Sequence, residues 1–199
     1  GSSALMLAWQ MVRGGVADCV LALGFERMEK GSLTLGDSRR TNPLDRHLQT
    51  MVSQRGMAKT PPAAQLFGNA GLEHMERYGS TPEQFAAVAV KNHAHSVHNE
   101  RAQFREEYSL EEVLASSPVH AMLTKLQCCP TSDGAAAVVL ASDDFMVAHG
   151  VEGHGVQVQG MAMATDLESS FGQSAISLVG FDMARKAAQQ CYELAGLGP

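Results

Sequence analysis

Residues 126–142 read LQCCPTSDGAAAVVLAS, and this stretch decides the fold. Asp133-Gly134 is a turn dipeptide, and the residues that follow it form a continuous run of small and branched apolar side chains. A short apolar run bounded by turn residues is typical of a strand covered on both faces. Ser142 is a favourable N-cap, so we predict a short helix after this strand, ending at Gly150.

Helix and strand patterns of the same kind recur near both ends of the chain. Residues 2–13 (SSALMLAWQMVR) predict a helix that is apolar nearly all round and therefore buried, followed by a buried strand at 19–25 (CVLALGF). Residues 156–164 (VQVQGMAMA) predict another strand, and 174–194 predict one long helix that Gly196 ends. With an aromatic content of only 6%, this order favours an α/β fold in which helices pack on a parallel sheet.

The middle of the chain is more polar and has the character of a helical insertion. Asn42-Pro43 and Pro61-Pro62 indicate irregular connections. We predict a helix from Ala63 to Tyr78, ended by Gly79, and a second from the capping box at Thr81 to about Val97. A third, short helix begins at the capping box of Ser109.

Composition excludes several classes of function. The formal net charge is −6, and the 15 basic residues form no stripe, which disfavours a nucleic-acid partner. No apolar run approaches the roughly 20 residues that cross a bilayer. The four cysteines fit no zinc spacing and are expected to be reduced thiols; they are Cys19, Cys128, Cys129 and Cys191.

Four segments together resemble the thiolase superfamily, and most closely its sterol carrier protein x type. They are residues 1–28, residues 65–99 (QLFGNAGLEHMERYGSTPEQFAAVAVKNHAHSVHN), residues 103–116 (QFREEYSLEEVLAS) and the stretch 126–142. The resemblance covers nearly the whole chain. It implies part of a two-half thiolase fold: residues 1–29 and 126–150 from the N-terminal half, 30–125 as the loop domain, and 151–199 as the start of the C-terminal half.

The resemblance also implies a function. Thiolases cleave 3-oxoacyl-CoA with free CoA as a substrate and need no further cofactor, and the expected parent is a homodimer. In the family motif the nucleophilic cysteine stands just before Gly1, where a helix N-terminus stabilises a thiolate. The histidine of an HDCF-type motif would follow Pro199. Both ends therefore read as cuts, no catalytic residue is expected in this chain, and its four cysteines are interpreted as structural.

The same resemblance places two sets of candidate substrate residues. Cys129, Pro130 and Thr131 would line the channel for the pantetheine arm of CoA, or else TSDG is only a turn before a strand. Gly180, Phe181 and Met183 stand where the family has a Met-Gly-x-Gly-Pro stretch near the acyl end of the substrate, or else are ordinary core. Phe181 and Asp182 depart from that pattern.

Charged and histidine-rich positions leave alternatives open. Lys91, Arg39 and Arg40 could pair with CoA phosphates or be simply solvated. His93, His95 and His98 could suggest a metal site, but only His95 and His98 share a helix face and no acidic or cysteine ligand is near, so we predict no metal.

The predicted function is therefore that of a fragment of a 3-oxoacyl-CoA thiolase in peroxisomal oxidation of fatty-acyl, branched-chain and sterol side chains, inactive on its own. Cytoplasm or mitochondrion are the alternative locations, because no targeting signal is present. The alternative function is a non-catalytic module that binds acyl-CoA or pairs with an intact thiolase. An incomplete translation product is a third reading.

Overall fold

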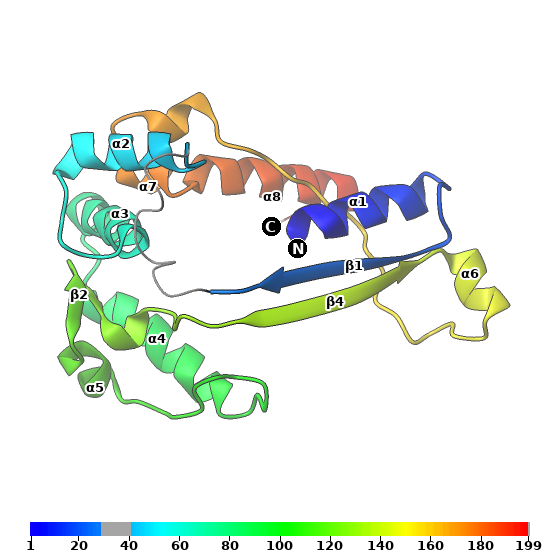
Figure 1. The fold of residues 1–199 in the computed structure, drawn as a ribbon, viewed down its shortest axis with the longest axis horizontal. Coiled ribbons are helices and arrows are strands. Elements are labelled where there is room, and N and C mark those ends of the chain that lie inside the picture. The colour runs from blue at the N-terminus through cyan, green and yellow to red at the C-terminus, as the bar shows by residue number, and fades with distance from the viewer. Residues whose placement is uncertain (29–40, 199) are drawn as a thin grey trace. The chain divides into compact units, whose positions relative to one another are not determined.

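The computed structural model describes residues 1–28 and 41–198, and these divide into two compact units (Figure 1). We call residues 1–29, 131–165 and 183–199 the strand unit, and residues 30–130 and 166–182 the helical unit. Arg39 and Arg40, which the sequence offered as possible partners of CoA phosphates, lie outside the described residues. The described part of the predicted loop domain, 30–125, belongs to the helical unit, which also includes 126–130 and 166–182.

The strand unit is built on one pair of long strands with a helix over one face. β1 (Cys19–Glu26) pairs with β4 (Gly134–Ala141), in a register that sets Leu21 opposite Val139 and Phe25 opposite Ala135. α1 (Ser2–Arg13) packs on this pair. The unit also contains α6 (Asp143–Ala148) and most of α8 (Phe181–Ala195). The predicted helix and both strands therefore exist at the expected positions.

The strands run antiparallel, so the expected parallel sheet is wrong for this pair. An apolar run covered on both faces has the same side-chain pattern in either direction, which is why the sequence could not distinguish them. The α/β class itself is confirmed, since helices and sheet are mixed along the chain.

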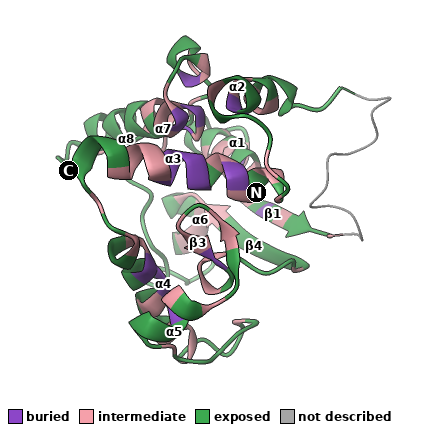
Figure 2. Ribbon diagram, turned by 90° about the vertical axis from the view of Figure 1, so that its left-hand side faces the viewer, coloured by how far each residue is buried: buried purple, intermediate pink, exposed green. Residues whose placement is uncertain are grey.

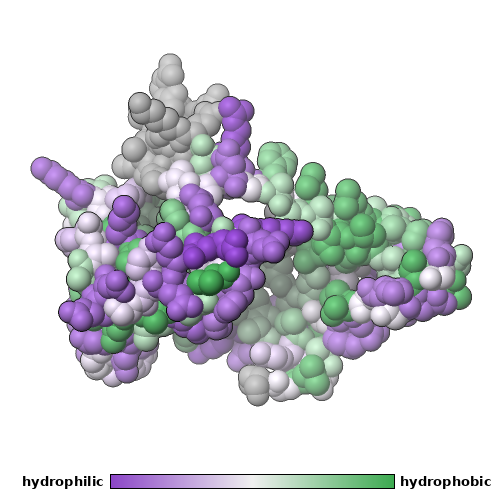
Figure 3. Space-filling model, turned by 90° about the horizontal axis from the view of Figure 1, so that it is seen from below, coloured by the Kyte–Doolittle hydropathy of each residue, from purple (hydrophilic) through white to green (hydrophobic). Residues whose placement is uncertain are grey.

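Burial of the strands and of α1 was also overpredicted. On β1 only Ala22 is buried, while Leu21, Leu23 and Phe25 are 63%, 52% and 78% exposed. Because side chains alternate along a strand, Ala22 faces α1 and the other three share the opposite face. Hydrophobic atoms gather on the surface over these strands (Figure 3). Among the described residues of this unit, α1 covers one face of the strand pair. Ala8 is the one buried residue of α1.

Two further elements differ from the prediction. Residues 156–164 form no strand; the segment is extended without a partner strand, and Gly160 packs so closely on α8 that a Cβ there would lie 2.6 Å from the Cys191 carbonyl oxygen. The long helix predicted over 174–194 is two helices, α7 (Ala175–Leu178) and α8. Gly180 interrupts it with φ of +95°, a conformation that glycine adopts without steric cost.

The helical unit contains five helices, a small hairpin and two 3-10 turns among its described residues. The helices besides α7 are α2 (Asp45–Arg55), α3 (Pro62–Tyr78), α4 (Pro82–Ser96) and α5 (Leu110–Ala115). The hairpin joins β2 (Pro118–His120) to β3 (Leu123–Thr124), and the turns are η1 (Lys125–Gln127) and η2 (Glu168–Phe171). Buried residues concentrate on α3, and others occur on α2, α4 and α5 (Figure 2).

The helix signals of this unit are confirmed by its caps. Ser109 accepts a hydrogen bond from the Glu112 amide, Gly79 ends α3 in a left-handed conformation, and the Gln84 side chain accepts from the Thr81 amide. The sequence did not predict α2, which has no side-chain cap at Leu44, its N-cap residue. It also missed the hairpin, whose strands are too short to show a pattern.

A small apolar core ties α4 to α5. Ala86, Ala89 and Val113 are buried, and partly buried hydrophobic residues pack around them, namely Val90, Tyr108, Leu114 and Leu126. No described helix is both long and apolar enough to cross a membrane.

Candidate functional site

The helical unit contains a cavity of about 510 Å³ beside this core. A cavity of this size falls within the range of roughly 300–1,000 Å³ that small-molecule sites occupy. Its lining is mostly apolar and comes from α4, the loop after it, and the chain from β3 onward; it comprises Phe85, Val88, Ala89, Asn92, His93, Ser96, Ala102, Gln103, Phe104, Leu123, Leu126, Gln127, Cys128, Cys129 and Pro130.

One wall is a single face of α4. Phe85, Val88, Asn92 and Ser96 recur at intervals of three or four residues, which places them on one side of a helix. Val88 and, from the loop, Phe104 are more than half exposed. Large apolar side chains that are exposed beside an apolar cavity are typical of a binding surface.

The opposite wall is the segment that leads from η1 to Pro130. His93 Nε2 lies 3.0 Å from the carbonyl oxygen of Leu126, and the Leu126 amide donates to Ser116 Oγ at 3.2 Å. The Thr124 amide donates to Gln127 Oε1 at 2.9 Å. Side chains from three elements therefore hold the backbone immediately before the two adjacent cysteines.

The environment of Cys128 favours a neutral thiol. Burial, with a smaller contribution from Cys129, raises the pKa of Cys128. A raised pKa keeps the sulfur protonated at neutral pH, and the thiolate is the nucleophilic form. Cys191 donates to the Gly160 carbonyl oxygen at 3.3 Å. Cys19, predicted to be buried, is exposed instead, since it belongs to the uncovered face of β1.

The predicted substrate residues are only partly brought together. Cys129 and Pro130 line the cavity, whereas Thr131 does not and belongs to the strand unit. Gly180 and Phe181 lie in the helical unit away from the cavity lining, and Met183 lies in the strand unit. Phe181 is 53% exposed, so it is not an ordinary core residue in this chain.

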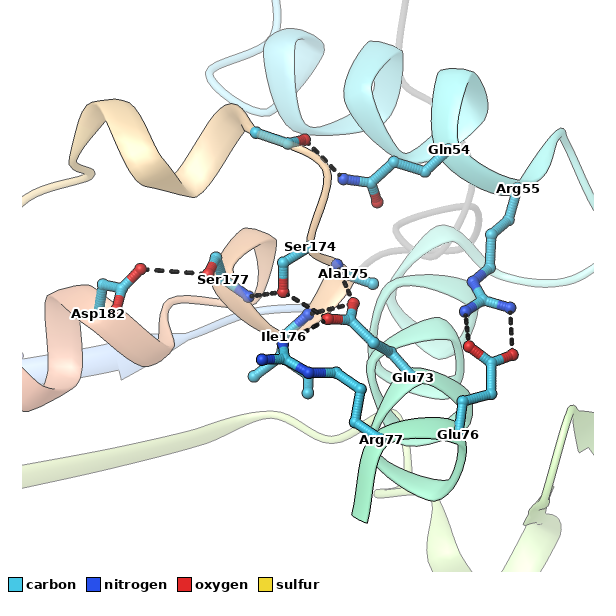
Figure 4. A network of polar contacts seen from close by, with 11 residues as sticks. Gln54, Arg55, Glu73, Glu76, Arg77, Ser174, Ala175, Ile176, Ser177 and Asp182 are labelled. Atoms are coloured by element: carbon cyan, nitrogen blue, oxygen red, sulfur yellow. Dashed lines mark hydrogen bonds and ion pairs between the residues drawn. The ribbon is translucent and has the colours of Figure 1, made fainter. Parts of the chain in front are cut away.

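The segment before Gly180 is held by a polar network that the sequence did not reveal (Figure 4). Glu73 on α3 accepts hydrogen bonds from the Ser174 hydroxyl and the Ala175 amide at the start of α7, and pairs with Arg77 at 2.9 Å. Burial alone raises the pKa of Glu73, but the hydrogen bonds it accepts outweigh burial, so its pKa lies below the usual range. The only sequence signal was the spacing of Glu73 and Arg77.

The neighbouring charges form a second, more exposed pair. Both guanidinium nitrogens of Arg55 on α2 contact the Glu76 carboxylate, at 3.0 and 2.6 Å. This bidentate pair links α2 to α3 and lies beside the Glu73 network (Figure 4).

The histidines do not gather around a common point. His93 is engaged by Leu126, while His95 and His98 are exposed, and no three His, Cys, Asp or Glu side chains converge anywhere in the described ranges. Lys91 is exposed and does not line the cavity.

Comparison with known proteins identifies the family. The sequence profile described as "Thiolase, N-terminal domain" matches residues 1–144. This chain belongs to the thiolase family. The predicted resemblance is thereby confirmed, and the strand pair with its covering helix, together with the helical unit up to β4, falls within the matched region.

Individual relatives agree with this assignment. Proteins named sterol carrier protein 2 from Gallus gallus and Homo sapiens are 54% and 53% identical over 200 residues, which cover 100% of this chain but 37% of theirs. Benzoylsuccinyl-CoA thiolase subunit BbsB of Thauera aromatica is 30% identical, covering 100% of this chain and 48% of its own. The chain thus spans about a third of the length of these sterol carrier proteins and about half of that thiolase subunit.

A solved structure supports the fold. The Ltp2-ChsH2(DUF35) aldolase superposes with a TM-score of 0.75 at 23% identity, covering 100% of this chain and 50% of that one. At this identity the likeness establishes the fold alone, and it confirms that the chain adopts part of a thiolase-like α/β fold.

Proposed function

We propose that this chain is part of a 3-oxoacyl-CoA thiolase of the sterol carrier protein x type, and that its cavity accepts the pantetheine arm of CoA. The observation that carries the second half is the position of Cys129 and Pro130 on the wall of an apolar cavity. Identity of 54% to a sterol carrier protein 2, over the full chain, supports the first half.

The chemistry of the cavity suits pantetheine. Its mostly apolar lining matches the methylene and gem-dimethyl groups of that arm, and the side-chain amides of Asn92, Gln103 and Gln127 offer partners for its amides. Such a site is mainly apolar with a few polar groups that fix orientation. The adenosine phosphates would extend beyond it, toward solvent.

The proposed reaction is thiolytic. A cysteine thiolate attacks the 3-oxo carbon, the bond between C2 and C3 breaks, and acetyl-CoA leaves once its C2 carbanion is protonated. Free CoA then takes the shortened acyl group from the cysteine. The nucleophilic cysteine and the catalytic histidine belong, in this proposal, to residues before Gly1 and after Pro199.

The chain by itself is proposed to be inactive. Cys128 is kept protonated by burial, and Cys191 is hydrogen-bonded to Gly160. A nucleophilic cysteine in a covalent mechanism is activated by a lowered pKa or an adjacent base, and burial shifts the pKa of Cys128 in the opposite direction. Loss of the nucleophile of a covalent mechanism costs about 10⁴–10⁶ in rate.

Location and assembly follow the family resemblance. We propose that the complete protein is a peroxisomal homodimer that shortens fatty-acyl, branched-chain and sterol side-chain thioesters. A pairing module is the second candidate, because β1 exposes Leu21, Leu23 and Phe25 on one continuous face.

A paired assay tests these proposals. The purified chain is mixed with a medium-chain 3-oxoacyl-CoA and CoA, and acetyl-CoA release is followed, while CoA binding is measured by the shift in melting temperature. We expect no turnover above buffer and a CoA-dependent shift.

Matched substitutions make the result specific. Val88→Arg places a charge beside the cavity and should abolish the CoA shift, whereas Val147→Arg, on the equally exposed α6, should preserve it. A shift that survives Val88→Arg would contradict the cavity as the CoA site. Turnover that disappears in Cys129→Ser would show that Cys129 is a nucleophile.

A further inference from the structure

The histidine-rich part of α4 contains one histidine with a defined partner. His93 is half-buried; its Nε2 lies 3.0 Å from the Leu126 carbonyl oxygen, and its ring packs edge-on against Tyr108 with 4.9 Å between ring centroids. Because a carbonyl oxygen can only accept, Nε2 must carry the proton. The side chains of His95 and His98 are exposed in the described structure.

The partner of His93 occupies a key position in the cavity wall. Both backbone groups of Leu126 are engaged from outside η1: its amide by Ser116 and its carbonyl by His93. Two residues later the chain enters the wall at Cys128, whose amide donates to the Lys125 carbonyl oxygen at 3.2 Å. The position of the Leu126 backbone therefore sets the position of the segment from Cys128 to Pro130.

His93 also lines the cavity itself, next to α4 residues on the facing wall. The His93 side chain thus links α4 to the segment that follows η1. Its ring N–H is the donor, and the Leu126 carbonyl oxygen is the acceptor. The edge-on contact with Tyr108, which packs on the α4–α5 core, limits rotation of the ring.

We infer that His93 is a positioning residue that sets the Cys128–Pro130 wall of the cavity, and so controls the affinity of the ligand that the cavity takes. For the identity of that ligand, CoA, the inference rests on the proposed function. Of the three histidines at 93, 95 and 98, it gives His93 a role in shaping a binding site, where the sequence had suggested a possible metal site.

Four variants test this role. His93→Ala removes the donor, and His93→Gln replaces it with an amide N–H that can reach a similar position. His95→Ala and His98→Ala are matched controls, because both are exposed histidines on or just beyond the same helix. Each protein is examined by the rate of N-ethylmaleimide labelling at the half-buried Cys128, resolved by mass spectrometry, and by calorimetric titration with CoA.

We expect His93→Ala to expose Cys128 and speed its labelling, and to weaken CoA binding by about tenfold, the factor that corresponds to loss of one hydrogen bond to a held carbonyl. His93→Gln should restore both values to within about threefold of the parent chain. The two control variants should match the parent. A general loss of packing would not be rescued by glutamine, so the rescue separates positioning from mere stability.

Several results would overturn the inference. One is a labelling rate and a CoA affinity in His93→Ala that equal those of the parent. A second is the failure of His93→Gln to restore either value, and a third is a His95→Ala variant that labels and binds CoA as His93→Ala does. If His93→Ala does not fold, Ser116→Ala takes its place, since it frees the Leu126 amide and should also accelerate Cys128 labelling. Unchanged labelling in Ser116→Ala would then contradict the inference.

The two readouts separate this inference from the proposed function. If the parent chain fails to bind CoA, the cavity is not the CoA site and the proposed function fails. The labelling rate of Cys128 still shows whether His93 positions the segment from Cys128 to Pro130.

Discussion

The carboxylate of Glu73 accepts a hydrogen bond of 2.7 Å from the hydroxyl of Ser174, although 101 residues separate them in the sequence. Ser174 is also the N-cap of α7, where its Oγ accepts from the Ser177 amide. Glu73 adds acceptors for the free amides of Ala175 and Ile176. A helix of only four residues is thereby held from outside, and so is the Gly180 break that follows it.

Replacing Glu73 should destabilise the helical unit. Glu73→Gln removes a charge from a mostly buried site and leaves a single acceptor oxygen for the start of α7, so we expect the free energy of unfolding to fall by about 1–3 kcal/mol. Urea denaturation measures this change. Glu76→Gln is the control. It breaks the ion pair with Arg55, but because that pair is solvent-exposed, the loss of stability should be clearly smaller. Equal losses in both variants would contradict a special role for Glu73.

The same residue predicts a pH dependence of stability. Burial opposes ionisation of Glu73, but its hydrogen bonds prevail and lower its folded pKa below the unfolded value of about 4.3. Its contribution is therefore fully present above the unfolded pKa and is lost as the pH falls through the folded pKa. The stability difference between the parent and Glu73→Gln, measured by urea denaturation at each pH, should shrink as the pH falls from about 6 to about 3. A difference independent of pH would show that the charge is not responsible.

Two glycines on α3 should respond differently to alanine. A Cβ at Gly68 would lie 2.6 Å from Cδ2 of His120, whose ring is held by Asn69 at 3.0 Å. A Cβ at Gly71 would overlap the end of Met122, a flexible side chain that can move aside. In a helix interior alanine is more favourable than glycine by about 1 kcal/mol. Overpacking costs about 1–3 kcal/mol, but only where the neighbouring side chain cannot move aside. The clash therefore outweighs the helix propensity at a fixed neighbour and not at a flexible one.

Gly68→Ala should therefore lower the free energy of unfolding, while Gly71→Ala should leave it nearly unchanged. Chemical denaturation of the two variants side by side measures the difference. Gly71→Ala proving the more destabilising of the two would mean that Met122 cannot relax.

The uncovered face of β1 should limit solubility of the isolated chain. Phe25→Thr combined with Leu21→Thr introduces two β-branched residues, which suit a strand, and removes exposed apolar surface, so we expect light scattering to begin at a higher protein concentration. Melting temperature should change little. Ala22→Thr is the contrasting variant, since it adds a hydroxyl on the buried face toward α1 and should lower the melting temperature. Unchanged aggregation in the double variant would show that another surface is responsible.

Local chemistry made most elements of the fold predictable. Ser109 and Ser142 form the expected N-caps, Gly79 ends α3, and the apolar runs at 19–25 and 135–141 are strands. Each signal depends on residues within one turn or one strand. The missed α2 lacks such a signal at Leu44, and its preceding Asn42-Pro43 was interpreted as an irregular connection.

The candidate site was predictable only in part, for the same physical reason. Cys129 and Pro130 were selected by resemblance and do line a cavity, but the facing residues Val88 and Phe104 carry no motif. His93 was conspicuous in the sequence for its neighbours His95 and His98, with which it shares no contact. Its partner is a backbone carbonyl 33 residues away, and a carbonyl has no sequence signature.

The amino-acid sequence was sufficient to predict the family and the positions of most helices and strands, because these depend on residue type and short spacing. Only the tertiary structure decided that β1 and β4 run antiparallel, that residues 174–194 form two helices divided at Gly180, and that Glu73 and His93 hold distant backbone. Strand direction and long-range hydrogen bonds depend on which segments meet in space. Because nearly every residue carries the same backbone N–H and C=O groups, the sequence does not show which of them will pair.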